Sequence, residues 1–296
     1  MSDGSWKRAL VLGGGGMIGV AWEAGLCRGL FERGVDLREC DAFVGTSAGA
    51  ITCSQLAAGL LPPGPNDPRP TGGEGANIDP SRIDMKALGQ AFTKWSQIQR
   101  TTPADAREIG LVARVLYRDT EASWVQGITA VSGGPTAWPT KPFFISAVDT
   151  ESGERAAFDN LHGVEIGRAI AASAAVPGIF ASVEIDGKLY MDGQVHSSTH
   201  ADVLLNHPRA KKAAEVIIAM PTNSSTAPGI GAHAEREVAA EIELLKAAGC
   251  IVRFVTPTAD HAARLGKNLM DASKMPDAYA VGLETGHALA PELLAK

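Results

Sequence analysis

The chain is poor in aromatic residues and in long apolar runs, and it carries no excess of positive charge. Aromatic residues make up 5% of its 296 residues, whereas aliphatic residues bring the hydrophobic share to 45%. Together with 20% charged residues, this is the profile of a folded globular protein, so disorder over the whole chain is excluded. The net charge of −6 argues against a general attraction to nucleic acid or anionic lipid. No nucleic-acid partner is therefore expected.

No segment is typical of a membrane span or a secretory signal. The small apolar stretch at 169–183 is interrupted by Pro177 and Gly178 and is too short to cross a bilayer as a helix. The apolar run that begins at Ala9 gives way after four residues to four consecutive glycines, which does not fit a signal peptide. The four cysteines contain no C-x-x-C pair, which favours reduced structural thiols. We expect a cytoplasmic protein with at most transient contact with a membrane surface.

Strand and helix patterns alternate along the first sixty residues, which predicts an α/β fold. A buried strand at 9–12 leads into the glycines and a helix over 18–33, and a second strand at 41–44 leads through Ser47 into a helix over 50–58. Two hairpins are predicted later in the chain, one pairing 143–148 with 154–158 and the other pairing 183–185 with 188–190. Two buried strands are then predicted at 215–220 and 251–256, and an amphipathic helix at 232–248 separates them.

A stretch dense in proline and glycine separates these parts. Residues 61–80 are too long and too rich in breakers for an ordinary connector, and we interpret them as a surface loop. Helices are predicted after it, at 84–99, 103–117 and 121–131. Because no repeat or clear linker is present, we expect a single domain over 1–296, with a loop and helical insertion at about 61–135.

One short motif carries the pattern of a catalytic nucleophile. In Gly45-Thr46-Ser47-Ala48-Gly49, a serine stands between two glycines at a strand-to-helix corner. Such a turn holds the hydroxyl clear of the backbone, because the flanking glycines lack the Cβ atoms that a sharp corner would crowd. The following helix begins beneath the hydroxyl, and its unpaired N–H groups favour the negative charge that develops in acyl transfer. Ser47 is the predicted nucleophile.

A second glycine turn is expected to meet this serine. Both turns follow strands, and the carboxyl ends of parallel strands lie at one edge of a sheet, where ligands bind. The N–H groups of Gly14, Gly15 and Gly16 would then converge near Ser47 as an oxyanion hole, with Ala48 N–H as a further donor. A glycine-rich turn without any ligand is the alternative interpretation.

Residues 14–19 also fit the G-x-G-x-x-G pattern of dinucleotide-binding proteins. That pattern requires a carboxylate at the end of the second strand, for the ribose hydroxyls, and this strand runs into Gly45-Thr46-Ser47 instead. A dinucleotide-binding protein or oxidoreductase remains the alternative function, but it leaves the G-x-S-x-G motif unexplained.

The base that would activate Ser47 can be a histidine or a carboxylate. Four of the seven histidines are expected in solvated positions, namely His162, His233, His261 and His287. The pair His196 and His200 has helical spacing but no third ligand, so no metal site is predicted. An α/β-hydrolase triad of Ser47 and Asp192 with His196, His200 or His207 can be written. The α/β-hydrolase fold, however, places several strands before its nucleophile, and this chain has only two before Ser47.

Asp192 is the better candidate for a direct base. It follows the strand at 188–191, precedes Gly193 and lies in a segment with little charge, so its carboxylate can face the floor of a cleft. The alternative is a turn aspartate that binds its own backbone, a common role for aspartate before glycine.

These motifs together resemble the patatin-like phospholipase family. The glycine loop at 14–19, the G-x-S-x-G serine and Asp192-Gly193 occur in the order found there, and residues 172–180 look like the helix-to-proline stretch that precedes the family's aspartate. The resemblance covers most of the first two hundred residues. It implies a three-layer α/β/α domain with a mainly parallel central sheet, a lipid or ester substrate and no cofactor.

The same resemblance implies ester hydrolysis by a Ser47–Asp192 dyad through an acyl-enzyme, of phospholipase A, lysophospholipase or esterase type. Gly14, Gly15, Gly16 and Ala48 would supply oxyanion donors, and the motif glycines are Gly19, Gly45, Gly49 and Gly193. A carboxylate base predicts activity at acid pH unless burial raises its pKa. The oligomeric state stays open.

Two positions depart from the family pattern. Ile18 stands where many members carry Arg or Lys, which removes a positive charge and weakens the expectation of a phosphate headgroup. Gln194 replaces the usual small residue after Asp192-Gly193 and leaves the dyad intact.

Overall fold

The computed structural model describes residues 5–65, 67, 85–115, 120–133 and 137–295. Within this described part, eight strands form one sheet in the order β5-β6-β3-β2-β1-β7-β8, with β4 paired to β3. Their bounds are β1 Trp6–Leu12, β2 Ala42–Gly45, β3 Phe143–Asp149, β4 Arg155–Phe158, β5 Val183–Ile185, β6 Lys188–Asp192, β7 Ala213–Ala219 and β8 Ile251–Val255. Strands β3, β2, β1, β7 and β8 run parallel, whereas β4 and β6 run antiparallel to β3, and β5 antiparallel to β6. The strands expected from the sequence are confirmed, with ends shifted by a few residues.

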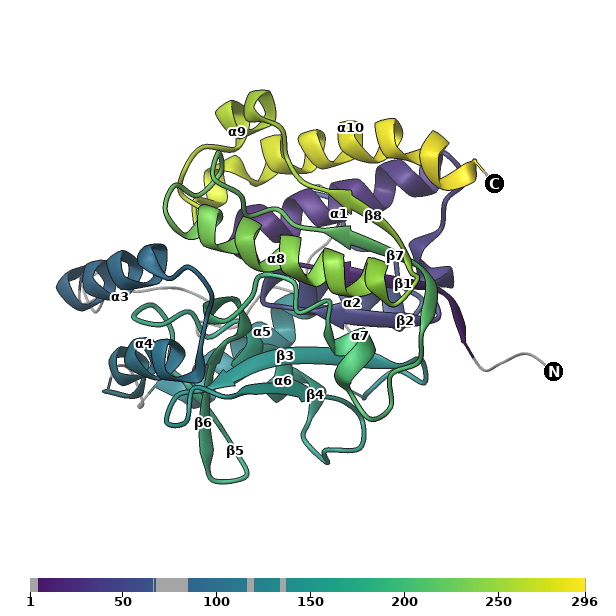
Figure 1. Cartoon of the computed structure of the whole chain (residues 1–296). Coiled ribbons are helices and arrows are strands. Elements are labelled where there is room, and N and C mark those ends of the chain that lie inside the picture. The colour runs from purple at the N-terminus through teal and green to yellow at the C-terminus, as the bar shows by residue number, and fades with distance from the viewer. Residues whose placement is uncertain (1–4, 66, 68–84, 116–119, 134–136, 296) are drawn as a thin grey trace.

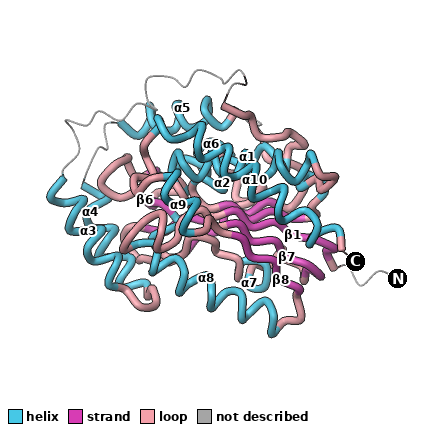
Figure 2. The backbone as a smooth tube through the Cα atoms, turned by 90° about the horizontal axis from the view of Figure 1, so that it is seen from above, coloured by secondary structure: helices cyan, strands magenta, loops and turns pink. Residues whose placement is uncertain are grey.

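Helices cover both faces of this sheet. One face carries α1 Gly16–Glu32, α2 Ala48–Ala57, α5 Glu121–Ser132, α6 Ile166–Ser173 and α10 Met275–Leu294, and the other carries α7 Val203–Asn206 and α8 Ile230–Ala247 (Figure 2). The remaining helices are α3 Met85–Gln97 and α4 Pro103–Val115, which lie beside the sheet, and α9 Ala259–Leu265 (Figure 1). The expected three-layer α/β/α fold with a mainly parallel sheet is therefore confirmed.

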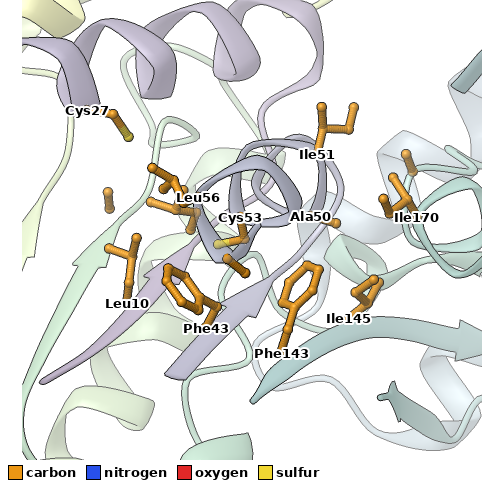
Figure 3. Packing of buried hydrophobic residues seen from close by; sticks show 14 of the residues in the cluster. Leu10, Cys27, Phe43, Ala50, Ile51, Cys53, Leu56, Phe143, Ile145 and Ile170 are labelled. Atoms are coloured by element: carbon orange, nitrogen blue, oxygen red, sulfur yellow. The ribbon is translucent and has the colours of Figure 1, made fainter. Parts of the chain in front are cut away.

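The core exists because the central strands are apolar on both faces. Successive side chains of a strand point to opposite sides, and a parallel sheet covered by helices on both sides buries them all. On one side, Leu10 and Phe43 pack with Leu56 of α2 (Figure 3). On the other, Val11 and its neighbours pack against Val238 of α8. Each such side chain contributes about 1.5–3 kcal/mol by leaving water, so this core fixes the sheet edge that holds the motifs.

Helix α10 lies along α1, the helix that follows the glycine loop (Figure 1). The two backbones approach closely because of a glycine: a Cβ on Gly25 would lie 2.1 Å from the carbonyl oxygen of Tyr279. No helix or strand is predicted for this C-terminal segment from the sequence pattern. Its packing against α1 anchors the helix that carries the glycine loop at its start.

The helical insertion is present as α3, α4 and α5, close to the expected ranges. Helix α3 packs against α8, and α4 packs against β3 and β6. Most of the proline- and glycine-rich segment at 61–80 lies outside the described residues, and the single-domain boundaries stay a prediction. Of the helices described, none has the length and apolar character needed to cross a membrane.

Candidate active site

The pairing register brings Ser47 and Asp192 to the same height at one edge of the sheet. Gly45 on β2 pairs with Ile145 on β3, and Ala147 on β3 pairs with Asp192 at the end of β6. Ser47 is two residues beyond Gly45, just as Ala147 is two residues beyond Ile145. The turn after β2 and the end of β6 therefore lie level on either side of β3.

Ser47 occupies a strained turn. Its backbone has φ 54° and ψ −115°, a conformation that costs a non-glycine residue about 1–3 kcal/mol. The turn persists because its neighbours hold it: Ser47 N–H donates to Ser173 Oγ at 2.9 Å, and α2 begins at the next residue. Gly49 is required here, since a Cβ would lie 2.0 Å from the Leu12 carbonyl oxygen. The geometry is that of a serine held out from a strand-to-helix corner.

Asp192 is fixed through its backbone and one carboxylate oxygen. Its N–H donates to the Ala175 carbonyl at 2.9 Å, and Oδ1 accepts the N–H of Gln194 at 2.8 Å. Oδ1 thus acts as in a turn aspartate that binds its own backbone, which was the alternative interpretation of the sequence. The other oxygen, Oδ2, has no partner in hydrogen-bonding geometry within the described part of the chain. One oxygen therefore positions the side chain and the other is free to accept a proton.

Burial sets the proton affinity of this carboxyl group. Loss of water raises the pKa of Asp192 from its ordinary 3.8 to about 7, although the Gln194 N–H and the nearby Ser47 hydroxyl oppose the rise. That value is close to the pKa of an ordinary histidine. Activity at acid pH is therefore no longer expected, because the buried carboxyl group of Asp192 stays protonated at acid pH.

The glycine loop follows β1 and supplies free N–H groups. Gly15, Gly16 and Ala48 have N–H groups without hydrogen-bond partners among the residues that the structure describes. Gly14 differs, and the expectation that it is an oxyanion donor needs correction. Its N–H donates to the Ser198 carbonyl at 2.9 Å, so the loop is tied to the segment after Asp192 at this point.

The other motif glycines lie where chains approach closely. Gly19 faces Ala48 at the crossing of α1 and α2, and Gly45 ends β2 against the start of α2. Gly193 lies against the Ser146 carbonyl of β3. A side chain at any of these positions would crowd neighbouring atoms, so these glycines allow the close packing around the site.

Ser47 and Asp192 line one cavity of about 280 Å³, together with Gly16 and Gln194. Its walls are mainly apolar and include Phe92, Trp95, Val176, Ile179, Ile230, Leu269 and Met270. The stretch around Val176 is part of the resemblance to the family, but the walls at 227–230 and 267–270 carried no signal in the sequence. Lys267 is the single cation among the described lining residues. Ile18, at the position where many family members carry Arg or Lys, is buried in the core and supplies no positive charge to the cavity.

None of the histidines considered for a triad lines this cavity in the described structure. His200 uses Nε2 in a hydrogen bond with the Gly193 carbonyl at 2.9 Å, and burial lowers its pKa to about 4. Burial lowers the pKa of His196 further, to about 2. His207 lies against the ring of Phe144. None of the three imidazoles is therefore among the lining residues that could act as the base for Ser47.

His233 corrects a further expectation, because it is not solvated. Its side chain is 1% exposed on α8, where Nε2 lies 2.6 Å from Thr101 Oγ1. It lies on the buried face of an amphipathic helix, and the sequence pattern did not distinguish that face from the polar one.

The start of α1 bears on the alternative function. A bound pyrophosphate would need the first N–H groups of this helix. One of these groups, Ile18 N–H, instead donates to the Leu269 carbonyl at 3.1 Å. The end of β2 carries no carboxylate, so the arrangement also lacks the ribose-binding feature of a dinucleotide site.

Solved structures similar to this chain include two at low sequence identity. No curated protein matches the chain. Among solved structures, VipD from Legionella pneumophila has a TM-score of 0.48 at 12% identity, covering 97% of this chain and 67% of that chain. The type III effector protein ExoU has a TM-score of 0.39 at 14% identity, covering 98% and 53%. The chain thus spans about two thirds of one and half of the other.

The model of the patatin-like phospholipase family matches residues 10–205. This match covers more than half of the chain and includes the glycine loop, Ser47 and Asp192. The strained serine, the buried aspartate and the free loop amides all lie inside it, and the chain therefore belongs to the patatin-like phospholipase family of lipid hydrolases.

Proposed function

We propose that the protein is a serine lipid acyl hydrolase, which cleaves carboxylic esters of lipids with Ser47 as nucleophile and Asp192 as base. One observation carries the proposal: the strained serine and the aspartate with its unpaired oxygen line the same largely apolar cavity. Serine activation requires a base within reach of the hydroxyl, and an apolar wall suits an acyl chain.

The chemistry follows from these positions. Ionised Asp192 accepts the proton of Ser47 Oγ as that oxygen attacks the ester carbonyl carbon, and the carbonyl electrons move onto the carbonyl oxygen. The free N–H groups of Gly15, Gly16 and Ala48 support this oxygen, each such donor being worth about 10²- to 10³-fold in kcat. As the tetrahedral species collapses, Asp192 returns the proton to the departing alcohol.

A second half-reaction releases the acid. Water attacks the acyl group on Ser47 and gives a proton to Asp192, which then protonates Ser47 Oγ as the ester bond breaks. A base with a pKa near the working pH is half ionised and still basic enough to accept the serine proton. Burial places Asp192 near that condition, with its pKa raised to about 7.

The cavity favours the acyl part of a lipid over a large polar group. Most of its lining is aliphatic or aromatic, and its volume of about 280 Å³ suits one extended chain better than two. Lys267 adds a positive charge to the lining, while Ile18 supplies none. Phospholipid, lysolipid and neutral ester remain the substrate classes to be compared.

Labelling with a fluorophosphonate probe tests the proposal directly. We expect the probe to modify Ser47, and Ser47→Ala to lose both labelling and hydrolysis of p-nitrophenyl esters. Ser54→Ala is a matched control, because Ser54 is a buried serine on the same helix that donates only to the Ile51 carbonyl. Labelling at another serine, or wild-type turnover by Ser47→Ala, would contradict the assignment. Stabilisation by NAD(P) without labelling would favour the dinucleotide alternative.

A further inference from the structure

Gln194 lies between the aspartate and the glycine loop. It belongs to a short 3₁₀ turn, Gly193–Val195, in which its own N–H binds Asp192 Oδ1. Its side chain extends to the loop: a Cβ on Gly14 would lie 2.2 Å from Oε1 and 2.9 Å from Cδ. The carboxamide therefore rests on the bare face of Gly14, where any larger residue would displace it.

The amide nitrogen of this side chain has no partner. Gln194 is 6% exposed, and Nε2 makes no hydrogen bond within the described part of the chain. A buried donor without a partner costs about 1–3 kcal/mol, so proteins rarely retain one without a reason. Gln194 lines the cavity together with Ser47 and Asp192, whose Oδ2 is unpaired as well. The two unpaired groups do not bond to each other.

One of the main-chain donors expected from the glycine loop is already in use. Gly14 N–H donates to the Ser198 carbonyl, so of the three glycines expected to act as oxyanion donors only Gly15 and Gly16 have an unpaired N–H in the described structure. The Gln194 side chain contacts Gly14 through Oε1 and Cδ, on the loop where the oxyanion is expected, and the residue lines the cavity together with Ser47. A neutral N–H held in a water-poor cavity stabilises an oxygen more strongly as negative charge develops on it.

We propose that Gln194 is a catalytic residue of this hydrolase, whose side-chain Nε2–H donates a hydrogen bond to the oxyanion formed when Ser47 attacks the ester. The inference rests on the proposed function and adds a side-chain donor to the main-chain oxyanion hole. The small residue usual at this position in the family pattern could not supply it.

Gln194→Met tests the donor while keeping most of the side-chain volume and the backbone N–H to Asp192. We expect kcat for p-nitrophenyl esters to fall about 10²-fold, with KM changed less than about threefold, because the lost bond strengthens in the transition state. Affinity for a trifluoromethyl ketone, which forms a tetrahedral oxyanion on the serine, should fall with kcat. The melting temperature should not fall, since an unpaired buried amide has been removed.

Gln55→Met is the matched control. Gln55 is also buried, but its Nε2 donates to the Ser132 carbonyl and it does not line the cavity. This variant should lose stability and keep kcat. Wild-type kcat in Gln194→Met would overturn the inference, as would a loss confined to KM with unchanged affinity for the ketone. An unlabelled, inactive wild-type protein would instead refute the proposed function itself.

Discussion

Replacing Asp192 by asparagine should abolish hydrolysis and also change how stability depends on pH. Asparagine keeps an oxygen that can accept the Gln194 N–H, so the turn after β6 is retained. What it removes is a carboxyl group that must ionise in a buried position. The folded wild-type protein bears the cost of that ionisation, whereas the variant does not.

The magnitude follows from the shift in pKa. Burial raises the pKa of Asp192 from 3.8 to about 7 in the folded protein, while the unfolded chain keeps the ordinary value. Below the unfolded pKa both states are protonated and no penalty arises. Between the two values the unfolded chain releases its proton first, so wild-type stability falls as pH rises, by about 1.4 kcal/mol per pH unit. Above about pH 7 the accumulated penalty is constant, at ~4 kcal/mol.

The new amide group of asparagine offsets part of this gain. Its NH₂ replaces the unpaired Oδ2 and costs about 1–3 kcal/mol, but that cost does not vary with pH. The diagnostic quantity is therefore the difference in unfolding free energy between variant and wild type, measured by urea denaturation from about pH 4 to pH 8. We expect the difference to grow in favour of the variant by up to ~4 kcal/mol across this range.

Ser47→Ala is the control, because it should also be inactive but retains the carboxyl group. It should keep at least the wild-type pH dependence, since the Ser47 hydroxyl lowers the pKa of Asp192. Glu23 and Glu241, whose pKa values burial also raises, contribute equally to all three proteins and cancel. A difference between Asp192→Asn and wild type that is flat over this range would refute the reasoning, since it would mean that Asp192 ionises at its ordinary pKa in the fold.

Three further outcomes follow from the same structure. The kcat/KM of the wild-type enzyme should fall about tenfold per pH unit below pH 7, as Asp192 becomes protonated; a rate plateau that extends to about pH 5 would contradict this assignment. Glu23→Gln should raise the melting temperature at alkaline pH, with little change near pH 4. The reason is that burial raises the pKa of Glu23, despite the hydrogen bond from Thr52, so that its ionisation destabilises the fold as pH rises; an equal shift at both pH values would argue against it. Lys267→Gln should lower kcat/KM for an anionic phospholipid about two- to fivefold and leave a neutral ester unchanged, as expected for one exposed charge; equal effects on both substrates would exclude a role in headgroup recognition.

The site combines several arrangements that oppose stability. Ser47 is held at positive φ, Asp192 is buried with one oxygen unpaired, and Gln194 carries an unpaired amide. Each costs free energy in the resting protein, and under the proposed mechanism each of these residues would act on an ester bound in the cavity. The rigid surroundings that hold them include the Ser173 hydroxyl on Ser47 N–H and the Ala175 carbonyl on Asp192 N–H.

The sequence by itself determined the order of elements and the residues that could react. Local signals carry that information: glycines mark the turns at Gly45 and Gly49, alternation and Asp-Gly mark the β5–β6 hairpin, and apolar periodicity marks α8. The motifs at Ser47 and Asp192 lie at strand ends for the same local reasons. Helix α10 is not predicted from comparable local signals, and its packing against α1 depends on close approach at Gly25 and Tyr279.

Only the tertiary structure decided how the reacting groups behave. It set the register that places Ser47 level with Asp192, buried the carboxyl group and so raised its pKa, and tied Gly14 N–H to Ser198. It also turned His233 inward and brought residues 227–230 and 267–270 to the cavity. These properties depend on loss of water and on contacts between segments far apart in the chain. The residues adjacent in sequence specify neither the loss of water at a side chain nor its contacts with distant segments.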